Sequence, residues 1–159
     1  RGLKGFYDRN PKRKLKIAMF EFGEDHSKTR DLARKLDVDQ YIAWFPQMSR
    51  KELMMGISIS DAVFGEVTRS WFSYGTILEA MVMKKAVIHH RDDHFYPNKK
   101  LYPMVKVHDA TSISDAFASI EKEEVDLAKM GTQSHKWLVE YGVGEAMKEI
   151  ILRIDRKRT

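Results

Sequence analysis

The segment from residue 70 to residue 83, SWFSYGTILEAMVM, contains the residues best suited to hold an anionic ligand. Its pattern predicts a helix that begins near Tyr74 with Ser73 as its cap. Backbone N–H groups at the start of a helix lack partners within the helix, and together with the helix dipole they attract anions. Gly75 removes side-chain bulk where a diphosphate would press against this backbone, and Thr76 adds a hydroxyl group. We therefore expect this helix start to bind phosphate groups.

Glu79 lies one helical turn after the predicted phosphate site, among apolar residues. A carboxylate in such a helix is costly to bury unless it is paired. At this distance from a diphosphate it could accept hydrogen bonds from the vicinal hydroxyl groups of a ribose. An ordinary helix with one exposed glutamate explains the stretch equally well when the stretch is considered alone.

A second group of candidates follows the apolar run YIAWF at residues 41–45. Trp44 and Phe45 offer flat apolar surface beside the amide of Gln47, an arrangement that could stack on a nucleobase and hydrogen-bond to its edge. A core tryptophan followed by a turn at Pro46 is the simpler interpretation, and these residues alone favour it.

The run HHRDDH at residues 89–94 contains types of side chain that bind metal ions. Because the residues are contiguous, their side chains should diverge instead of converging on one ion. A loop that contacts a sugar, or a plain polar loop, is the better interpretation. No protein-bound metal and no resident cofactor are predicted.

The elements that would position these residues alternate between short apolar strands and amphipathic helices. Such alternation predicts a doubly wound parallel sheet flanked by helices, with ligands beyond the carboxyl ends of the strands. The expected strands are 17–22, 41–45, 61–64, 86–89 and 104–107. The expected helices are 28–36 with Ser27 as cap, 49–57 with a Ser49–Glu52 capping box, 74–83, 112–120, 123–130 ended by Gly131, 134–140 and 145–153.

Length and composition limit the class of protein. The 159 residues suit a single domain with its own core, which we take to be 1–159 with a last helical segment at about 134–154. Cysteine is absent, which excludes a disulfide framework and a thiolate metal site and makes a cytoplasmic setting the default. No apolar run has the length of a membrane span, and no signal peptide is visible.

The formal net charge of +5 favours an anionic partner. Basic residues cluster at 12–16 and 153–158, where they are either solvated ends or a surface for peripheral contact with the inner face of an anionic membrane. Nucleic acid is not expected as a partner, because no nucleic-acid-binding motif is present and the aromatic residues lie in apolar strands. Neither a dinucleotide-binding glycine pattern nor a P-loop occurs.

The runs KLKIAMFEFGED, YIAWFPQMSRKEL, SDAVF and YGTILEAMVMKKAVI together resemble the C-terminal, donor-binding domain of GT-B glycosyltransferases. The likeness is to the large retaining group 1 family that includes glycogen and sucrose synthases, and it covers nearly the whole chain. The LEAM element at residues 78–81, followed by a strand, is its most specific part. The resemblance implies a Rossmann-like fold and a nucleotide-diphosphate sugar as donor substrate.

The resemblance also implies roles for single residues. Glu79 matches the second glutamate of the family's Glu–seven residues–Glu motif, which binds the donor ribose. Residues 74–76 match the helix start whose amides hold the diphosphate. Arg1 and Lys4 resemble the Arg…Lys-Gly pair that neutralises the phosphates, and the Trp44-x-Pro46-Gln47 element is similar to nucleotide-contacting residues of inverting UDP-glycosyltransferases.

The sequence departs from the family at one informative position. Trp71 stands where the motif has its first glutamate, and Glu66, the nearest upstream acid, is out of register. In the family that glutamate lies beside the donor sugar, so the retaining or inverting outcome and the catalytic residue stay open.

The function expected from these features is donor binding for glycosyl transfer, in polysaccharide, glycolipid or glycoconjugate synthesis. An N-terminal acceptor domain, not contained in this chain, would complete the enzyme, and the chain alone would transfer nothing. A nucleotide-sugar epimerase of similar fold is an alternative. A non-catalytic nucleotide-binding or receiver-like signalling module is another, although Phe64-Gly65-Glu66 lacks the aspartate that a receiver needs after its third strand.

Overall fold

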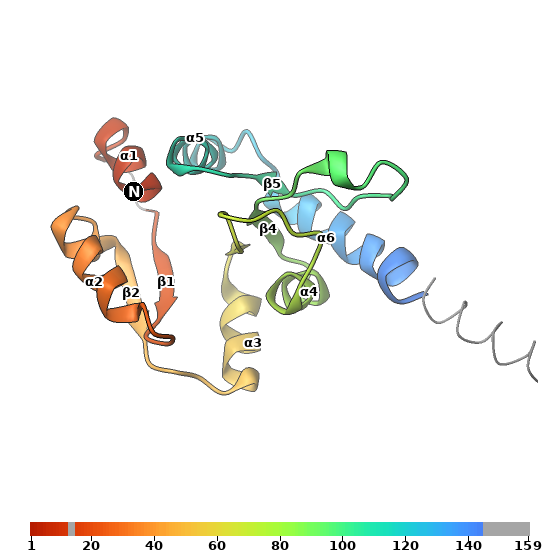
Figure 1. Cartoon of the computed structure of the whole chain (residues 1–159), viewed down its shortest axis with the longest axis horizontal. Helices are drawn as coiled ribbons and strands as arrows, with labels where there is room; N and C mark the ends of the chain where they lie inside the picture. Colours follow the sequence, from red (N-terminus) through yellow and green to blue (C-terminus); the bar gives the residue numbers. More distant parts are fainter. Residues whose placement is uncertain (13–14, 145–159) are drawn as a thin grey trace, which may run out of the picture. The chain divides into compact units, whose positions relative to one another are not determined.

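The computed structural model describes residues 1–12 and 15–144, and its architecture is α/β with parallel strands and flanking helices (Figure 1). The predicted fold class is therefore confirmed. The strands form two separate parallel sheets instead of one continuous sheet. The chain divides into two compact units, of which unit 1 comprises residues 1–56 and 107–126, and unit 2 comprises residues 57–106 and the chain from Leu127 onward.

Unit 1 contains a two-stranded parallel sheet with helices around it. Strands β1 and β2 pair in register from Ile17 opposite Ile42 to Phe20 opposite Phe45. The elements of this unit are α1 (Gly2–Arg9), β1 (Ile17–Phe20), α2 (His26–Lys35), the 3-10 turn η1 (Asp39–Tyr41), β2 (Ile42–Phe45) and α5 (Ala110–Glu121). Helix α3 (Arg50–Ile59) follows, and the predicted Ser49–Glu52 capping box is confirmed, since the Ser49 amide donates to the Glu52 carboxylate over 2.8 Å.

The N-terminal helix α1 packs on α5, which lies far away in the sequence. Phe6 is fully buried and meets the ring of Phe117 edge-on at a centroid distance of 6.0 Å. A Cβ placed on Gly2 would lie 2.6 Å from the Cβ of Ile113, so the two helices approach as closely as glycine permits. Arg9 donates to Asp115 over 2.8 Å at the edge of this contact.

Unit 2 contains a three-stranded parallel sheet in the order β3-β4-β5. All residues of the central strand are buried, as expected for an apolar strand covered on both faces. The elements of unit 2 are β3 (Ala62–Phe64), α4 (Gly75–Val82), β4 (Ala86–His89), the 3-10 turn η2 (Asp93–Phe95), β5 (Val105–Lys106), α6 (Leu127–Trp137) and the π-helical segment η3 (Leu138–Gly144). The buried residues Ile77, Ala80, Met81, Val87, Tyr102, Trp137 and Leu138 form one hydrophobic core in this unit.

Helix α6 shows two errors in the expected boundaries. The predicted helix 123–130 does not begin at Glu123, which has a positive φ of 58° just after α5, and it does not end at Gly131, which lies inside α6. A Cβ on Gly131 would lie 2.6 Å from the carbonyl carbon of Lys84, so this glycine permits a close approach of backbones and does not stop the helix. The predicted helix 134–140 is the continuation of α6 into η3.

The remaining predictions concern a helix boundary and the two ends of the chain. The cap of α2 is Asp25 and not Ser27, which lies inside the first turn. The predicted helix 145–153 and most of the basic ends lie outside the described residues, so membrane contact through those ends stays a prediction. None of the described helices is long and apolar enough to cross a membrane.

Candidate functional site

Helix α4 begins after the loop that follows β3, at the carboxyl edge of the unit 2 sheet. Its N-cap, Tyr74, has an extended backbone with φ −158° and ψ 178°. Within the described part of the chain, the Tyr74 side chain makes no capping hydrogen bond. A Cβ added to Gly75, the first helical residue, would have no atom within 4 Å. An uncapped first turn with open space beside it is the arrangement that an anion site at a helix start requires.

The side chain of Tyr74 has a structural role. The prediction of Ser73 as the helix cap was wrong. Ser73 stands one residue too early, because Tyr74 takes the extended conformation of a cap. The Tyr74 hydroxyl accepts a hydrogen bond from the Glu66 amide, and its ring lies edge-on to His89 at 6.5 Å. Burial raises the pKa of Tyr74. The Tyr74 side chain therefore helps to hold the loop before α4.

Hydrogen bonds join the loop before α4 to the loop that follows β4. The His90 amide donates to the Glu66 carbonyl over 2.9 Å, and the Trp71 amide donates to the His90 carbonyl over 3.1 Å. The Asp92 amide donates to the hydroxyl of Ser70 over 2.8 Å. The start of α4 is therefore held by segments that leave two neighbouring parallel strands, which is where α/β proteins bind their ligands.

Glu79 shares a helix face with this start. It lies three residues after Thr76 and four after Gly75, and residues at these spacings are neighbours on a helix surface. Glu79 is half-buried, whereas Ile77 and Met81 on the other side of α4 are fully buried in the core. The structure thus brings Gly75, Thr76 and Glu79 together along one side of α4.

The acids and aromatic residues upstream of α4 have other partners. Glu66 accepts hydrogen bonds from the amide of Thr68 over 2.7 Å and from its hydroxyl. The Thr68 hydroxyl and then its amide hold the pKa of Glu66 below its usual range, so this carboxylate is ionised and engaged within its own loop. The side chain of Trp71 is 45% exposed at the position where the family motif has an acid. The segment therefore offers an aromatic surface at that position.

Sequence patterns missed a buried polar network beneath this loop. His89 and Tyr102 are buried, and His89 Nε2 lies 2.9 Å from the Tyr102 hydroxyl, which in turn donates to the carbonyl of Phe72. Because the hydroxyl uses its only proton on that carbonyl, His89 must donate from Nε2. Burial, and then the charge of Arg91, lower the pKa of His89 to about 4, and burial raises the pKa of Tyr102 to about 12. The apolar residues around Tyr102 in the sequence were the only pattern that could have indicated its burial.

The predicted nucleobase residues lie in unit 1, at the end of β2 and just after it. Phe45 and Gln47 are exposed there. Trp44 is engaged by the fold: its indole N–H donates to Asp39 over 2.7 Å, and the Arg30 guanidinium lies 5.4 Å from its ring centroid. Trp44 is thus only partly buried but engaged within unit 1, which leaves the ring of Phe45 and the amide of Gln47 as the groups that can meet a base.

The predicted phosphate cations also belong to unit 1. Arg1 is exposed and is the N-cap residue of α1, a helix that the sequence patterns did not predict. Lys4 lies on α1, and its ammonium donates to Asp8 one turn later. Both groups of this pair are about half exposed, and an exposed pair of this kind contributes little stability, so Lys4 can exchange partners at small cost.

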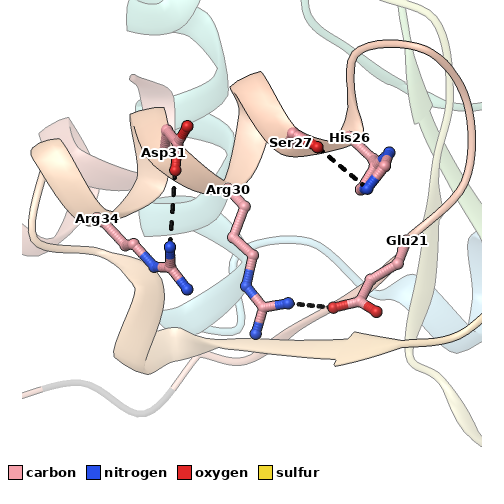
Figure 2. Close-up of a pocket in the computed structure, with 6 residues that line it drawn as sticks. All are labelled: Glu21, His26, Ser27, Arg30, Asp31 and Arg34. Carbon is pink, nitrogen blue, oxygen red and sulfur yellow. Dashed lines mark hydrogen bonds and ion pairs between the residues drawn. The ribbon is translucent and has the colours of Figure 1, made fainter.

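A small pocket of about 230 Å³ lies at the carboxyl end of β1, beside the first turns of α2 (Figure 2). Figure 2 shows Arg30 reaching from α2 to the carboxylate of Glu21, and Arg34 lies 3.6 Å from Asp31. The charges of this pocket are thus balanced pair by pair, which gives it no preference for an anion.

The His/Asp run after β4 does not converge on one point. His89 is buried, the Asp92 carboxylate accepts from the His94 amide over 3.0 Å, and Asp93 pairs with Arg91 over 2.8 Å. Across residues 1–12 and 15–144, no group of acids and histidines is arranged to hold a metal ion.

Parallel strands, flanking helices and a helix start at the sheet's carboxyl edge define a Rossmann-like domain. Among solved structures, a mutant of TarM from S. aureus, crystallised in complex with fondaparinux, α-GlcNAc-glycerol and UDP, shares this fold with a TM-score of 0.72 at 13% sequence identity. The match covers 96% of this chain, which spans 31% of the TarM chain. The sequence matches no protein-family model and no curated protein. The chain therefore has a glycosyltransferase-like fold.

Proposed function

We propose that this chain is the nucleotide-sugar-binding domain of a glycosyltransferase and that the start of α4 holds the donor diphosphate. The uncapped first turn with open space beside Gly75 carries this proposal. The shared fold and the UDP in the TarM complex support it.

The roles follow from the chemistry of each group. The amides of Gly75 and Thr76 donate to diphosphate oxygens, and the Thr76 hydroxyl adds a donor. Glu79, on the same face, accepts from the ribose hydroxyls. Negative charge develops on the departing nucleoside diphosphate during glycosyl transfer, and helix amides can stabilise it without a protein-bound metal. In unit 1, Arg1 and Lys4 stay predicted phosphate-binding cations.

In unit 1, Phe45 and Gln47 stay predicted nucleobase-binding residues. An exposed aromatic ring can stack on any base, whereas an amide can donate to and accept from a base edge. This pair would therefore provide affinity through the ring and discrimination through the amide.

A panel of nucleotides tests the proposal. A ligand that binds only the native state raises the melting temperature, by an amount that grows with the logarithm of its concentration relative to its Kd. Among UDP, GDP and ADP, we expect one nucleotide to raise the melting temperature more than the other two. The nucleotide sugars with the same base should do so as well. If none of them raises the melting temperature, the proposal is overturned.

Two substitutions locate the binding site. Gly75→Leu places bulk where the diphosphate would lie, at a position where a side chain meets no protein atom, so the fold should persist. Gly56→Leu is the matched control, because Gly56 also has open space around its Cβ position. We expect at least about tenfold weaker nucleotide binding for Gly75→Leu, which corresponds to about 1.4 kcal/mol. Equal binding by both variants would remove α4 from the site.

The ribose role of Glu79 needs its own measurement. Glu79→Gln keeps the shape of the side chain and halves its acceptors. Loss of hydrogen bonds to a charged acceptor should weaken binding of the ribonucleotide by about tenfold. A nucleotide that lacks the ribose hydroxyl groups should bind the variant and the wild type equally well, and unequal binding would assign Glu79 another role.

Transfer requires an acceptor-binding domain in this proposal. The isolated chain should bind nucleotide and transfer no sugar to any acceptor, as measured by release of nucleoside diphosphate. Sugar transfer by the purified 159-residue chain would contradict this expectation.

A further inference from the structure

Unit 2 contains a second concave surface, which shares no lining residue with the start of α4. It is a groove of about 670 Å³ between the segment that follows β4, strand β5 and the end of α6. Its charged lining residues are Arg91, Lys100, Lys106, Lys136, Asp93 and Glu140. We call this surface the basic groove. Four cations face two carboxylates, so the lining has a net charge of 4 − 2 = +2.

Arg91 supplies a fixed positive charge to the basic groove. Its side chain is only 2% exposed. Nε donates to Asp93 over 2.8 Å, Nη2 donates to the Tyr102 carbonyl over 3.0 Å, and the guanidinium lies 4.3 Å from the Tyr102 ring centroid. In the part of the chain that the structure describes, Nη1 is buried without a partner. These contacts keep the guanidinium from turning away, so its positive charge has a fixed place at the groove.

The carboxylates do not cancel the cations. Asp93 accepts from both Arg91 and Lys106. Burial acts to raise the pKa of Asp93, but the hydrogen bonds from Lys106 and Arg91 lower it, so one negative charge serves two positive ones. Glu140 lies 3.8 Å from Lys136 and also acts on Lys100, so this carboxylate too faces two cations.

Lys100 has a neutral partner. Its ammonium donates to the hydroxyl of Tyr141 over 2.6 Å and lies 4.4 Å from the ring centroid. The hydrogen bond to Tyr141 raises the pKa of Lys100 and keeps it charged. An ammonium group has three donors, and a hydroxyl acceptor occupies one of them.

Concave surfaces lined by charge of one sign concentrate ions of the other sign. Charge-assisted hydrogen bonds from lysine to phosphate are among the strongest that side chains make. A volume of about 670 Å³ lies in the range of small-molecule sites, which is more than a bare ion needs.

We propose that the basic groove binds a phosphate ester, with Lys100, Lys106 and Lys136 contacting the phosphate above the buried charge of Arg91. The net charge of the lining matches a phosphate dianion. The ester could be a soluble sugar phosphate or the headgroup of a phospholipid, and both present the same group to the lysines. This site is separate from the proposed nucleotide site.

Calorimetric titration of the full chain with glucose 6-phosphate tests the soluble source, with glucose as the neutral comparison. Lys100→Gln/Lys136→Gln removes exposed lysines from the basic groove and leaves Arg91 in place, so the fold should survive. Lys35→Gln/Lys51→Gln, with exposed lysines on α2 and α3, is the matched control for net charge. We expect at least about tenfold weaker binding for the groove variant and no change for the control.

Sedimentation with vesicles of phosphatidylcholine, with and without phosphatidylglycerol, tests the lipid source. Binding that needs phosphatidylglycerol and is lost in the groove variant supports the proposal with a headgroup as ligand. Equal losses in the groove and control variants would mean non-specific attraction and would overturn it. Binding of neither probe would overturn it as well.

The nucleotide site is distinguished by its own variant. Gly75→Leu and saturating UDP should leave glucose 6-phosphate binding unchanged, because Gly75 does not line the basic groove. If Gly75→Leu abolishes this binding, the phosphate lies at α4 and the basic groove is not its site. A chain that binds glucose 6-phosphate in the groove but no nucleotide would retain this inference and refute the proposed function.

Discussion

A single hydroxyl group, that of Tyr102, determines which ring nitrogen of the neutral His89 carries the proton. The Tyr102 hydroxyl gives its proton to the Phe72 carbonyl, so the imidazole must donate from Nε2. A second proton would place a positive charge in a buried position near Arg91, and this is why the pKa of His89 falls to about 4. The network joins β4 to the loop that leads into α4.

This lowered pKa predicts a pH dependence of stability. An unfolded histidine has a pKa near about 6.5, so between that value and about 4 the unfolded chain binds a proton that the native chain does not. The free energy of unfolding should therefore fall as pH falls through this window, by up to about 3 kcal/mol. Above about pH 6.5 the contribution of His89 should be constant.

Urea unfolding at several pH values between about 4 and 7 measures this dependence. His89→Gln can keep a donor for Tyr102 but does not titrate, so it should lose this part of the slope. His94→Gln, at an exposed position, should keep it. If His89→Gln and the wild type show the same slope, the native state does not lower the pKa of His89.

Residue roles were predictable only where they depend on the backbone. Gly75 and Thr76 lie at a helix start as expected, because strand and helix patterns locate such a start. The use of the Tyr74 hydroxyl by the Glu66 amide was not visible, since it depends on how the intervening loop turns. Arg91 was also missed, because a lone arginine in a polar run gives no sign of burial.

At the scale of elements, Gly131 shows how a glycine can be misread. A glycine near the end of an apolar pattern commonly stops a helix, but this one lies inside α6 beside the turn after α4. The contact with the carbonyl of Lys84 comes from another part of the chain, so no local pattern contains it. Local capping boxes are different, and the one at Ser49 was correct because both of its partners are close in sequence.

Substitution of this glycine has a definite expected sign. In Gly131→Ala, the new Cβ would collide with backbone atoms of Lys84 and Lys85, which cannot rotate away. We expect a loss of about 1–3 kcal/mol in the free energy of unfolding, as for other overpacked sites. In Gly56→Ala, the same change in α3 meets no atom within 4 Å and should stabilise the helix by about 0.5–1 kcal/mol.

Denaturant unfolding of these two variants separates packing from helix propensity, because both replace a helical glycine by alanine. A stabilised Gly131→Ala would mean that α6 and the segment after α4 can move apart at little cost.

The strands expected from the sequence agree closely with those of the structure, since buried parallel strands are apolar on both faces. Their division into two sheets was not predictable from such patterns.

At the scale of the molecule, each unit has its own apolar centre. In unit 1, Phe6 is buried against Phe117, and Tyr7 stacks on Tyr41 at a centroid distance of 3.5 Å. In unit 2, the core includes Ile77. Separate cores allow the units to open with separate free energies.

Native-state hydrogen exchange can test this independence. Phe6→Leu should lower the protection of amides in α1 and α5, and Ile77→Val should lower that of amides in α4 and β4, each by about 0.5–1.5 kcal/mol. The two variants are controls for each other. A uniform loss of protection in both units for either variant would mean that the chain opens as one unit.

The pairing of α1 with α5 has a consequence for the newly made chain. Because residues 1–56 of unit 1 need residues 107–126, α1 leaves the ribosome well before its partner helix exists. At usual rates of translation the delay is on the order of ten seconds. During this time Phe6 and Tyr7 have no α5 to cover them, so a chaperone that recognises aromatic segments would find its substrate here.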